Sequence, residues 1–196
     1  MPEEQLFRGI LIVAAVILFP IGIVHRVRSR SNESLDRWQE GRLILFTLRP
    51  IGIATMLGLI AYMINPRWMA WSAMPLPAWA RWTGVGLGAA GGVLLIWAMS
   101  SLGKNLTDTV VTRRDHTLIL RGPYRWVRHP FYDAVALSVI ANGLVAANWF
   151  LLTGGLLTFT LLLVRTDKEE ERLVGRFGDA YRDYMARTGR FLPKLR

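Results

Sequence analysis

Two clusters of polar side chains interrupt an otherwise apolar chain, and they carry its candidate chemistry. The first, residues 121–132, reads RGPYRWVRHPFY, and the second, residues 165–171, reads RTDKEEE. The first contains Gly122-Pro123 and His129-Pro130, and these proline breaks are incompatible with one continuous helix. Histidine, arginine and carboxylate groups together suit a zwitterionic or multiply polar ligand at a site partly shielded from water.

The composition indicates a membrane protein. Of the 196 residues, 52% are hydrophobic and 19% are charged, and there is no cysteine. The chain therefore has no disulfide, no thiolate nucleophile and no cysteine metal site, and three dispersed histidines do not predict a metal centre. The net charge of +10 lies beside apolar blocks. This placement favours a positive-inside membrane topology over nucleic-acid binding.

Five apolar segments are predicted to form membrane helices. Residues 131–164 are too long for one helix across a bilayer at about 1.5 Å per residue, so they are expected to form a hairpin with a tight turn near Ala146-Ala147-Asn148. The fold class is therefore all-α: a polytopic membrane protein of about five transmembrane helices, the last two a hairpin, with a cytoplasmic C-terminal helix. The predicted spans are residues 6–24, 43–64, 82–99, 132–145 and 149–164.

Basic residues set the expected orientation. Arginines follow the first span, and Lys104, Arg113 and Arg114 follow the third. Both loops are therefore expected on the cytoplasmic side of the cell inner (plasma) membrane, with the N-terminus outside. Residues 65–81, rich in tryptophan and proline, are expected to form an outer interfacial loop.

A literal G-x-G-x-x-G lies at residues 86–91 inside the third apolar segment. A dinucleotide-binding loop needs a strand before it and a helix start after it, and neither is predicted here. Gly84, Gly88 and Gly92 are spaced four apart. The pattern favours close packing between two membrane helices.

The predicted hairpin returns residues 165–171 to the membrane face that holds residues 121–132. Each cluster also has a simpler interpretation. Arg125 and Arg128 would suit lipid headgroups, Glu169 and Glu170 a solvated helix face, and His129 a helix cap. The convergence of both clusters on one face favours a site.

From about residue 76 onward the chain resembles the isoprenylcysteine carboxyl methyltransferase and phospholipid methyltransferase group of integral membrane enzymes. The first two predicted helices carry none of its motifs. The resemblance rests on His116-Thr117-Leu118, Gly122-Pro123-Tyr124, Arg128-His129-Pro130 with Tyr132, Glu170-Glu171 with Leu173, Phe177-Gly178, Tyr181, Tyr184, Arg190-Phe191 and Pro193.

The resemblance implies a methyltransferase that uses S-adenosyl-L-methionine and acts on a lipid or lipophilic small molecule in the membrane. It divides a single domain, residues 1–196, into three N-terminal helices (1–99) and a cofactor-binding half (100–196). Arg165 would face the acceptor as the catalytic residue. Asp133 stands where the family often has a small residue, and is expected to shape the acceptor site with Arg165. The implied cofactor-binding residues are His116, Leu118, Tyr124, Arg128, His129, Pro130, Glu169 and Glu170.

Several alternatives remain open on the sequence. The acceptor atom can belong to a carboxylate, a thiol or an amine, and only the last two require a base, for which His129 or a glutamate is a candidate. An NADPH-dependent membrane reductase of the sterol reductase type and a non-catalytic lipid-binding protein are the competing functions.

Overall fold

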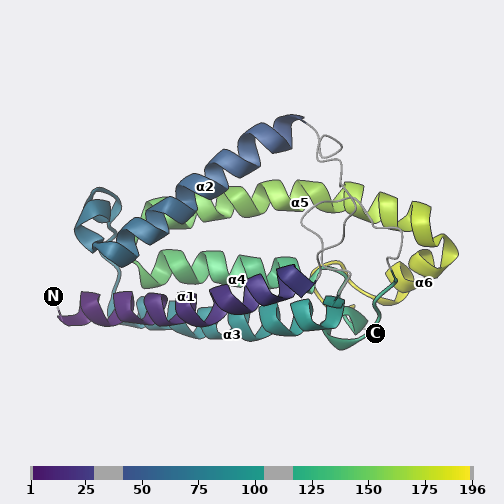
Figure 1. Ribbon diagram of the computed structural model, residues 1–196, viewed down its shortest axis with the longest axis horizontal. Helices are drawn as coiled ribbons and strands as arrows, with labels where there is room; N and C mark the ends of the chain where they lie inside the picture. Colours follow the sequence, from purple (N-terminus) through teal and green to yellow (C-terminus); the bar gives the residue numbers. More distant parts are fainter. Residues whose placement is uncertain (1, 29–41, 104–116, 195–196) are drawn as a thin grey trace.

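The computed structural model describes residues 2–28, 42–103 and 117–194, and these parts of the chain are helical without a β-strand. Figure 1 shows an elongated bundle in which the N-terminus and the α6 region lie at opposite ends. The all-α prediction is confirmed. The elements are α1 (Pro2–Arg28), α2 (Arg42–Ile64), the 3-10 helix η2 (Pro66–Ser72), α3 (Ala78–Leu102), the 3-10 helix η4 (Gly122–Arg125), α4 (Pro130–Val145), α5 (Trp149–Phe177) and α6 (Asp179–Arg187).

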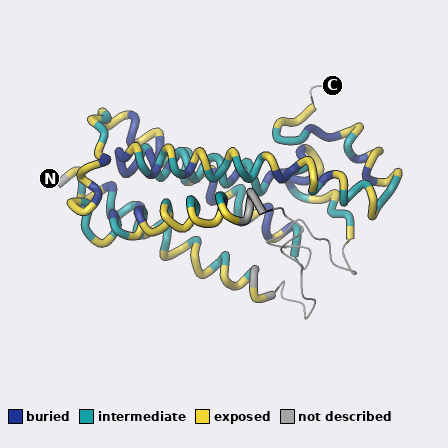
Figure 2. The backbone as a smooth tube through the Cα atoms, turned by 90° about the horizontal axis from the view of Figure 1, so that it is seen from above, coloured by how far each residue is buried: buried dark blue, intermediate teal, exposed yellow. Residues whose placement is uncertain are grey.

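Four of these helices, α1, α2, α3 and α5, are long and apolar enough to cross a membrane, and α4 is a shorter apolar helix. Exposed positions run along the length of the bundle (Figure 2). They include large apolar side chains such as Phe19, Phe46 and Val93, which are 69%, 65% and 68% exposed. Helices satisfy their own backbone hydrogen bonds, so such apolar surfaces suit contact with lipid.

Helix α5 is longer than the sequence predicted. The apolar segment was expected to end at Val164, but α5 continues through the second polar cluster to Phe177 and stops at Gly178, whose φ is 56°. The charged residues past Val164 are good helix formers, so the helix continues beyond the point where the apolar segment ends. The second cluster therefore lies on a rigid helix that is continuous with the apolar part of α5.

The glycines of α3 allow close helix packing, as predicted, with Gly84 against α4 and Gly92 against Leu18 of α1. A Cβ on Gly84 would lie 2.8 Å from the Leu144 side chain, and one on Gly91 would lie 3.0 Å from Leu137. Gly88 also faces α4, whereas Gly86 has nothing within 4 Å. The G-x-G-x-x-G segment is thus the middle of a packed helix, with no strand before it among the described residues.

The turn between α4 and α5 lies where the sequence placed it. Ala147 has a positive φ of 45°. Asn148 caps α5, because its Oδ1 accepts a hydrogen bond from the Leu151 backbone N–H at 3.0 Å. Its amide nitrogen also donates to the Ser72 hydroxyl at 2.8 Å, which ties the turn to η2.

Arg81 was assigned to the outer loop, and this was wrong: α3 begins at Ala78, and Arg81 is buried within it. Its Nε donates to the Val145 carbonyl at 2.9 Å, and its Nη1 forms an ion pair with Glu4 at 2.8 Å. The Tyr62 hydroxyl also donates to Glu4. Arg81 therefore holds α1, α2 and the end of α4 together, far from the polar clusters.

Candidate active site

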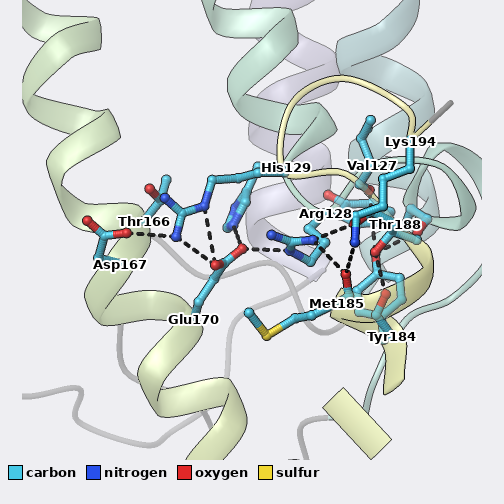
Figure 3. Close-up of polar contacts among 12 residues, drawn as sticks. Val127, Arg128, His129, Thr166, Asp167, Glu170, Tyr184, Met185, Thr188 and Lys194 are labelled. Carbon is cyan, nitrogen blue, oxygen red and sulfur yellow. Dashed lines mark hydrogen bonds and ion pairs between the residues drawn. The ribbon is translucent and has the colours of Figure 1, made fainter. Parts of the chain in front are cut away.

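The two polar clusters meet where α4 begins, and Glu170 of α5 is at the centre of the contact (Figure 3). Its Oε1 accepts hydrogen bonds from Arg128 Nε at 2.7 Å and from His129 Nε2 at 3.1 Å. Its Oε2 accepts from Arg190 Nη2 at 2.6 Å, and Arg190 also pairs with Asp167 at 2.7 Å. We call these five residues, Arg128, His129, Asp167, Glu170 and Arg190, the ion cluster.

The proline breaks position the first half of the ion cluster. Gly122 begins η4 with a φ of 61°, and a Cβ there would lie 2.2 Å from the Ser101 hydroxyl. Only glycine fits this approach to the end of α3. Pro130 occupies the first turn of α4, with His129 at the N-cap. The 3-10 turn and the helix start thus fix the direction in which His129 leaves the backbone.

The segment after α6 completes the site. Val127 and Gly189 form a parallel β-bridge, in which the Arg128 N–H donates to the Gly189 carbonyl at 2.9 Å. Arg128 Nη1 donates to the Thr188 carbonyl at 2.6 Å. The same segment delivers Arg190 to Glu170. Sequence reasoning used Arg190 only as a family motif and gave Thr188 no role, because these backbone contacts leave no periodic signal.

The tyrosines beside this segment are neutral structural groups. The Tyr184 hydroxyl donates to the Tyr124 carbonyl at 2.6 Å. Burial raises the pKa of Tyr184 to about 12 and raises the pKa of Tyr124 well above its usual value. Near neutral pH both hydroxyls therefore remain protonated.

Charges in the ion cluster are matched closely. Hydrogen bonding to Glu170 raises the pKa of Arg190 above its usual range. Since Glu170 accepts from the His129 ring at Nε2, that nitrogen carries a proton. The ring lies beside Tyr132 and Phe191, with centroids 5.4 and 5.7 Å away.

Other predicted site residues lie around the ion cluster. The Tyr132 hydroxyl donates to Glu169 Oε2 at 2.9 Å. Arg165 is buried, at 8% exposure, whereas Asp133 is half-buried in the first turn of α4. Leu118 is half-buried in the segment before η4, Tyr124 and Pro130 are buried, and His116 lies outside the described residues.

The structure thus gives different contacts to the two glutamates that were predicted to bind the cofactor. Both oxygens of Glu170 already accept hydrogen bonds from the protein. Glu169 is half-buried, and only its Oε2 accepts from a described residue. The geometry makes Glu170 an organising residue and leaves Glu169 the better placed of the two for a ligand.

The isoprenylcysteine carboxyl methyltransferase (ICMT) family matches residues 84–175. The matched segment begins in α3 and includes η4, α4 and most of α5, with both halves of the Glu170 contact. Through this segment, which is a little less than half of the chain, the protein is similar to the isoprenylcysteine carboxyl methyltransferase family. The resemblance seen in the sequence is confirmed.

Two curated relatives differ in how much of the chain they match. Protein-S-isoprenylcysteine O-methyltransferase of Dictyostelium discoideum is 28% identical over 65% of this chain and 56% of its own length. Methanethiol S-methyltransferase of Mycobacterium tuberculosis is 27% identical over 93% of this chain and 78% of its own length. The chain thus spans about half the length of the first relative.

A solved structure shares the fold. A eukaryotic intramembrane Ras methyltransferase of the isoprenylcysteine carboxyl methyltransferase type matches with a TM-score of 0.53 and 23% identity, over 74% of this chain and 51% of that one. At this identity the match describes the arrangement of helices alone.

Proposed function

We propose that this protein transfers a methyl group from S-adenosyl-L-methionine to a lipophilic or membrane-partitioning acceptor. The observation that carries the proposal is the convergence of the family-matched segments on one half-buried polar site, through the contact of Arg128 and His129 with Glu170. The site lies at the end of apolar helices, where a membrane-dissolved acceptor and a water-soluble donor can meet.

The residues around the ion cluster fit the methyl donor chemically. The donor has an ammonium group and ribose hydroxyls, which suit a carboxylate, and its own carboxylate suits N–H donors. Glu169 offers the carboxylate, and among the described residues nothing bonds its Oε1. His129 donates to Glu170 through Nε2, so its Nδ1 is an acceptor that suits the ammonium group or a ribose hydroxyl of the donor. When bound, the donor supplies an electrophilic methyl group.

We assign the remaining predicted residues around this donor. His116, Leu118, Tyr124 and Pro130 would line its pocket, with Arg128 and Glu170 fixing the position of His129. Arg165 would orient the acceptor from α5. The protein's contribution is mainly alignment of the two reactants and exclusion of water.

The acceptor is proposed from the relatives and from the membrane setting. One relative is named for a carboxyl of isoprenylcysteine and the other for the sulfur of methanethiol. Both acceptors partition into lipid or cross it readily. We take a lipophilic acceptor as the common class.

Cofactor titration tests the proposal. Purified protein in detergent micelles is titrated calorimetrically with S-adenosylmethionine and, separately, with NADPH. Binding of S-adenosylmethionine is expected, and Glu169→Gln should weaken it at least tenfold. Glu171→Gln is the matched control, because Glu171 is exposed on the same helix. Binding of NADPH without binding of S-adenosylmethionine would contradict the methyltransferase proposal and favour a reductase.

Radiolabelled methyl transfer tests the activity itself. The protein is incubated with a lipid extract and methyl-labelled donor, and labelled products are identified by mass spectrometry. A labelled lipophilic product is expected, and Arg165→Ala should reduce labelling at least a hundredfold. Equal labelling by the variant would mean that Arg165 does not act on the acceptor.

We also propose that the site faces the cytoplasm, with the N-terminus on the outside of the inner membrane. The chain has no cysteine, so single cysteines report without background. In intact cells, a membrane-impermeant maleimide is expected to label Glu3→Cys and to spare Arg182→Cys, both of which are exposed positions. The reverse pattern would invert the topology.

A further inference from the structure

Asp133 is a carboxylate that the described structure leaves without a polar partner. It lies in the first turn of α4 and is half-buried. Among the described residues no hydrogen bond or ion pair holds its side chain, whereas Asp167, Glu169 and Glu170 are all held. An ionisable group among membrane helices is costly and is by default a candidate for function.

Contacts between α4 and α5 place Asp133 on the membrane side of the ion cluster. The helices are antiparallel: His129 contacts Glu170, and further along, a Cβ on Gly155 would lie 2.6 Å from Val139. One turn from His129 toward Val139 is Asp133, and its N–H donates to the His129 carbonyl at 3.2 Å. The corresponding turn of α5 holds Arg165 and the buried Thr166.

Few charged groups surround this position. His129 interacts electrostatically with Asp133 from the start of the same helix, and Tyr132 precedes it. Helix α5 contributes Arg165, Glu169 and Glu170 to this end of the hairpin. Helix α3 approaches through Gly91, whose Cβ would lie 3.3 Å from the Ala134 carbonyl, and its residues 88–102 carry no charge.

The helix dipole explains why an acidic residue stands at position 133, but it does not explain why that residue is half-buried without a polar partner among the described residues. An acidic residue in the first turn of a helix is stabilised by the helix dipole, and Asp179 of α6 plays that part while exposed to solvent. Asp133 gains the same interaction with the helix dipole but loses part of its hydration. The dipole interaction does not require that loss, because Asp179 has the interaction while exposed.

Building on the proposed methyl transfer, we infer that Asp133 is the general base of the reaction and that the acceptor atom is a thiol sulfur rather than a carboxylate oxygen. The thiol proton passes to a carboxylate oxygen of Asp133. The sulfur forms a bond to the methyl carbon as the bond between that carbon and the donor sulfonium breaks. The products are a methyl thioether, neutral S-adenosylhomocysteine and protonated Asp133, which returns its proton to water.

A carboxylate acceptor fits this position poorly. It is already an anion and needs no base, and beside Asp133 it would experience repulsion in a poorly hydrated site. A thiol enters uncharged, and Asp133 then has a proton to remove. The buried guanidinium of Arg165 on α5 provides positive charge at this end of the hairpin as the thiolate forms.

The test compares two acceptors of the same length, octanethiol and octanoate, in lipid nanodiscs with methyl-labelled donor. The wild-type protein is expected to methylate the thiol at least a hundredfold faster than the carboxylate. Asp133→Asn should reduce the thiol kcat by about 10²–10⁴-fold, with donor affinity within twofold of wild type. Asp133→Glu should restore part of the rate. Asp179→Asn, the matched control, should change neither.

The pH profile separates a base from a merely structural acid. The wild-type rate should fall at low pH as Asp133 becomes protonated, whereas the residual rate of Asp133→Asn should follow ionisation of the thiol itself. Faster methylation of octanoate, or thiol turnover in Asp133→Asn within threefold of wild type, overturns the inference. So does donor binding without thiol methylation. Failure to bind the donor at all instead overturns the methyltransferase proposal.

Discussion

Replacing Glu170 with glutamine removes the one charge that three basic groups share. Arg128 is most affected, because its side chain is only 9% exposed and it cannot recover water in exchange for the ion pair. Breaking a buried ion pair from one side costs about 3–5 kcal/mol. Arg190 is 34% exposed and regains hydration, so it adds little. Because glutamine retains one acceptor oxygen, we expect a loss of about 3 kcal/mol.

For a chain of this size, about 3 kcal/mol corresponds to a drop in Tm of roughly 10 °C. Tryptophan fluorescence during heating measures it, in a fixed detergent, for wild type, Glu170→Gln and Glu171→Gln. The exposed Glu171 has no ion pair among the described residues, so its variant should stay within about 0.5 kcal/mol of wild type. Equal Tm values for the two variants would refute the idea that Glu170 organises the site.

Three further perturbations test other parts of the structure. Gly84→Ala should lower stability by about 1–3 kcal/mol because its Cβ would lie 2.8 Å from a leucine of α4, whereas Gly86→Ala should be neutral or stabilising; equal melting curves would contradict this. Arg81→Met should cost about 1–3 kcal/mol, because the Val145 carbonyl loses its donor while Glu4 is 37% exposed and regains hydration. The exposed Arg67→Met should cost almost nothing, as measured by size-exclusion chromatography after heating. Tyr184 has a pKa of about 12, against about 10 when unfolded. Its contribution to stability is therefore present below pH 10 and is lost toward pH 12, so Tyr184→Phe should flatten that part of the Tm profile, and an unchanged slope would disprove its role.

Chain length and residue spacing were enough to predict the arrangement that brings the site together. Residues 131–164 exceed one bilayer crossing, so a hairpin followed, and with it the meeting of the two polar clusters. The four-residue spacing of Gly84 and Gly88 predicted close helix packing, because small residues at this spacing in an apolar helix let a neighbouring helix approach. The hairpin and the glycine packing were both predictable because each depends on residues that are close together in the sequence.

The parts that were missed depend on distant partners. Arg81 and Glu4 are 77 residues apart, and only the folded chain shows that this arginine is buried rather than interfacial. The hydropathy pattern predicted that α5 ends at Val164, because hydropathy does not measure the helix propensity of charged residues. Contacts of Glu170 with Arg128 and Arg190 likewise required the register of α5 and the docking of the final segment. Sequence alone therefore paired the clusters without ranking their glutamates.

The uninterrupted course of α5 links the height of the site to the thickness of the bilayer. Its 29 residues span roughly 44 Å at 1.5 Å per residue, more than the hydrocarbon core requires. Glu170 is therefore held at a fixed distance from the lipid-facing turns, with no hinge between them. A thinner or thicker membrane must tilt the whole helix or deform around it, and either response shifts the site relative to the headgroups through which an acceptor arrives.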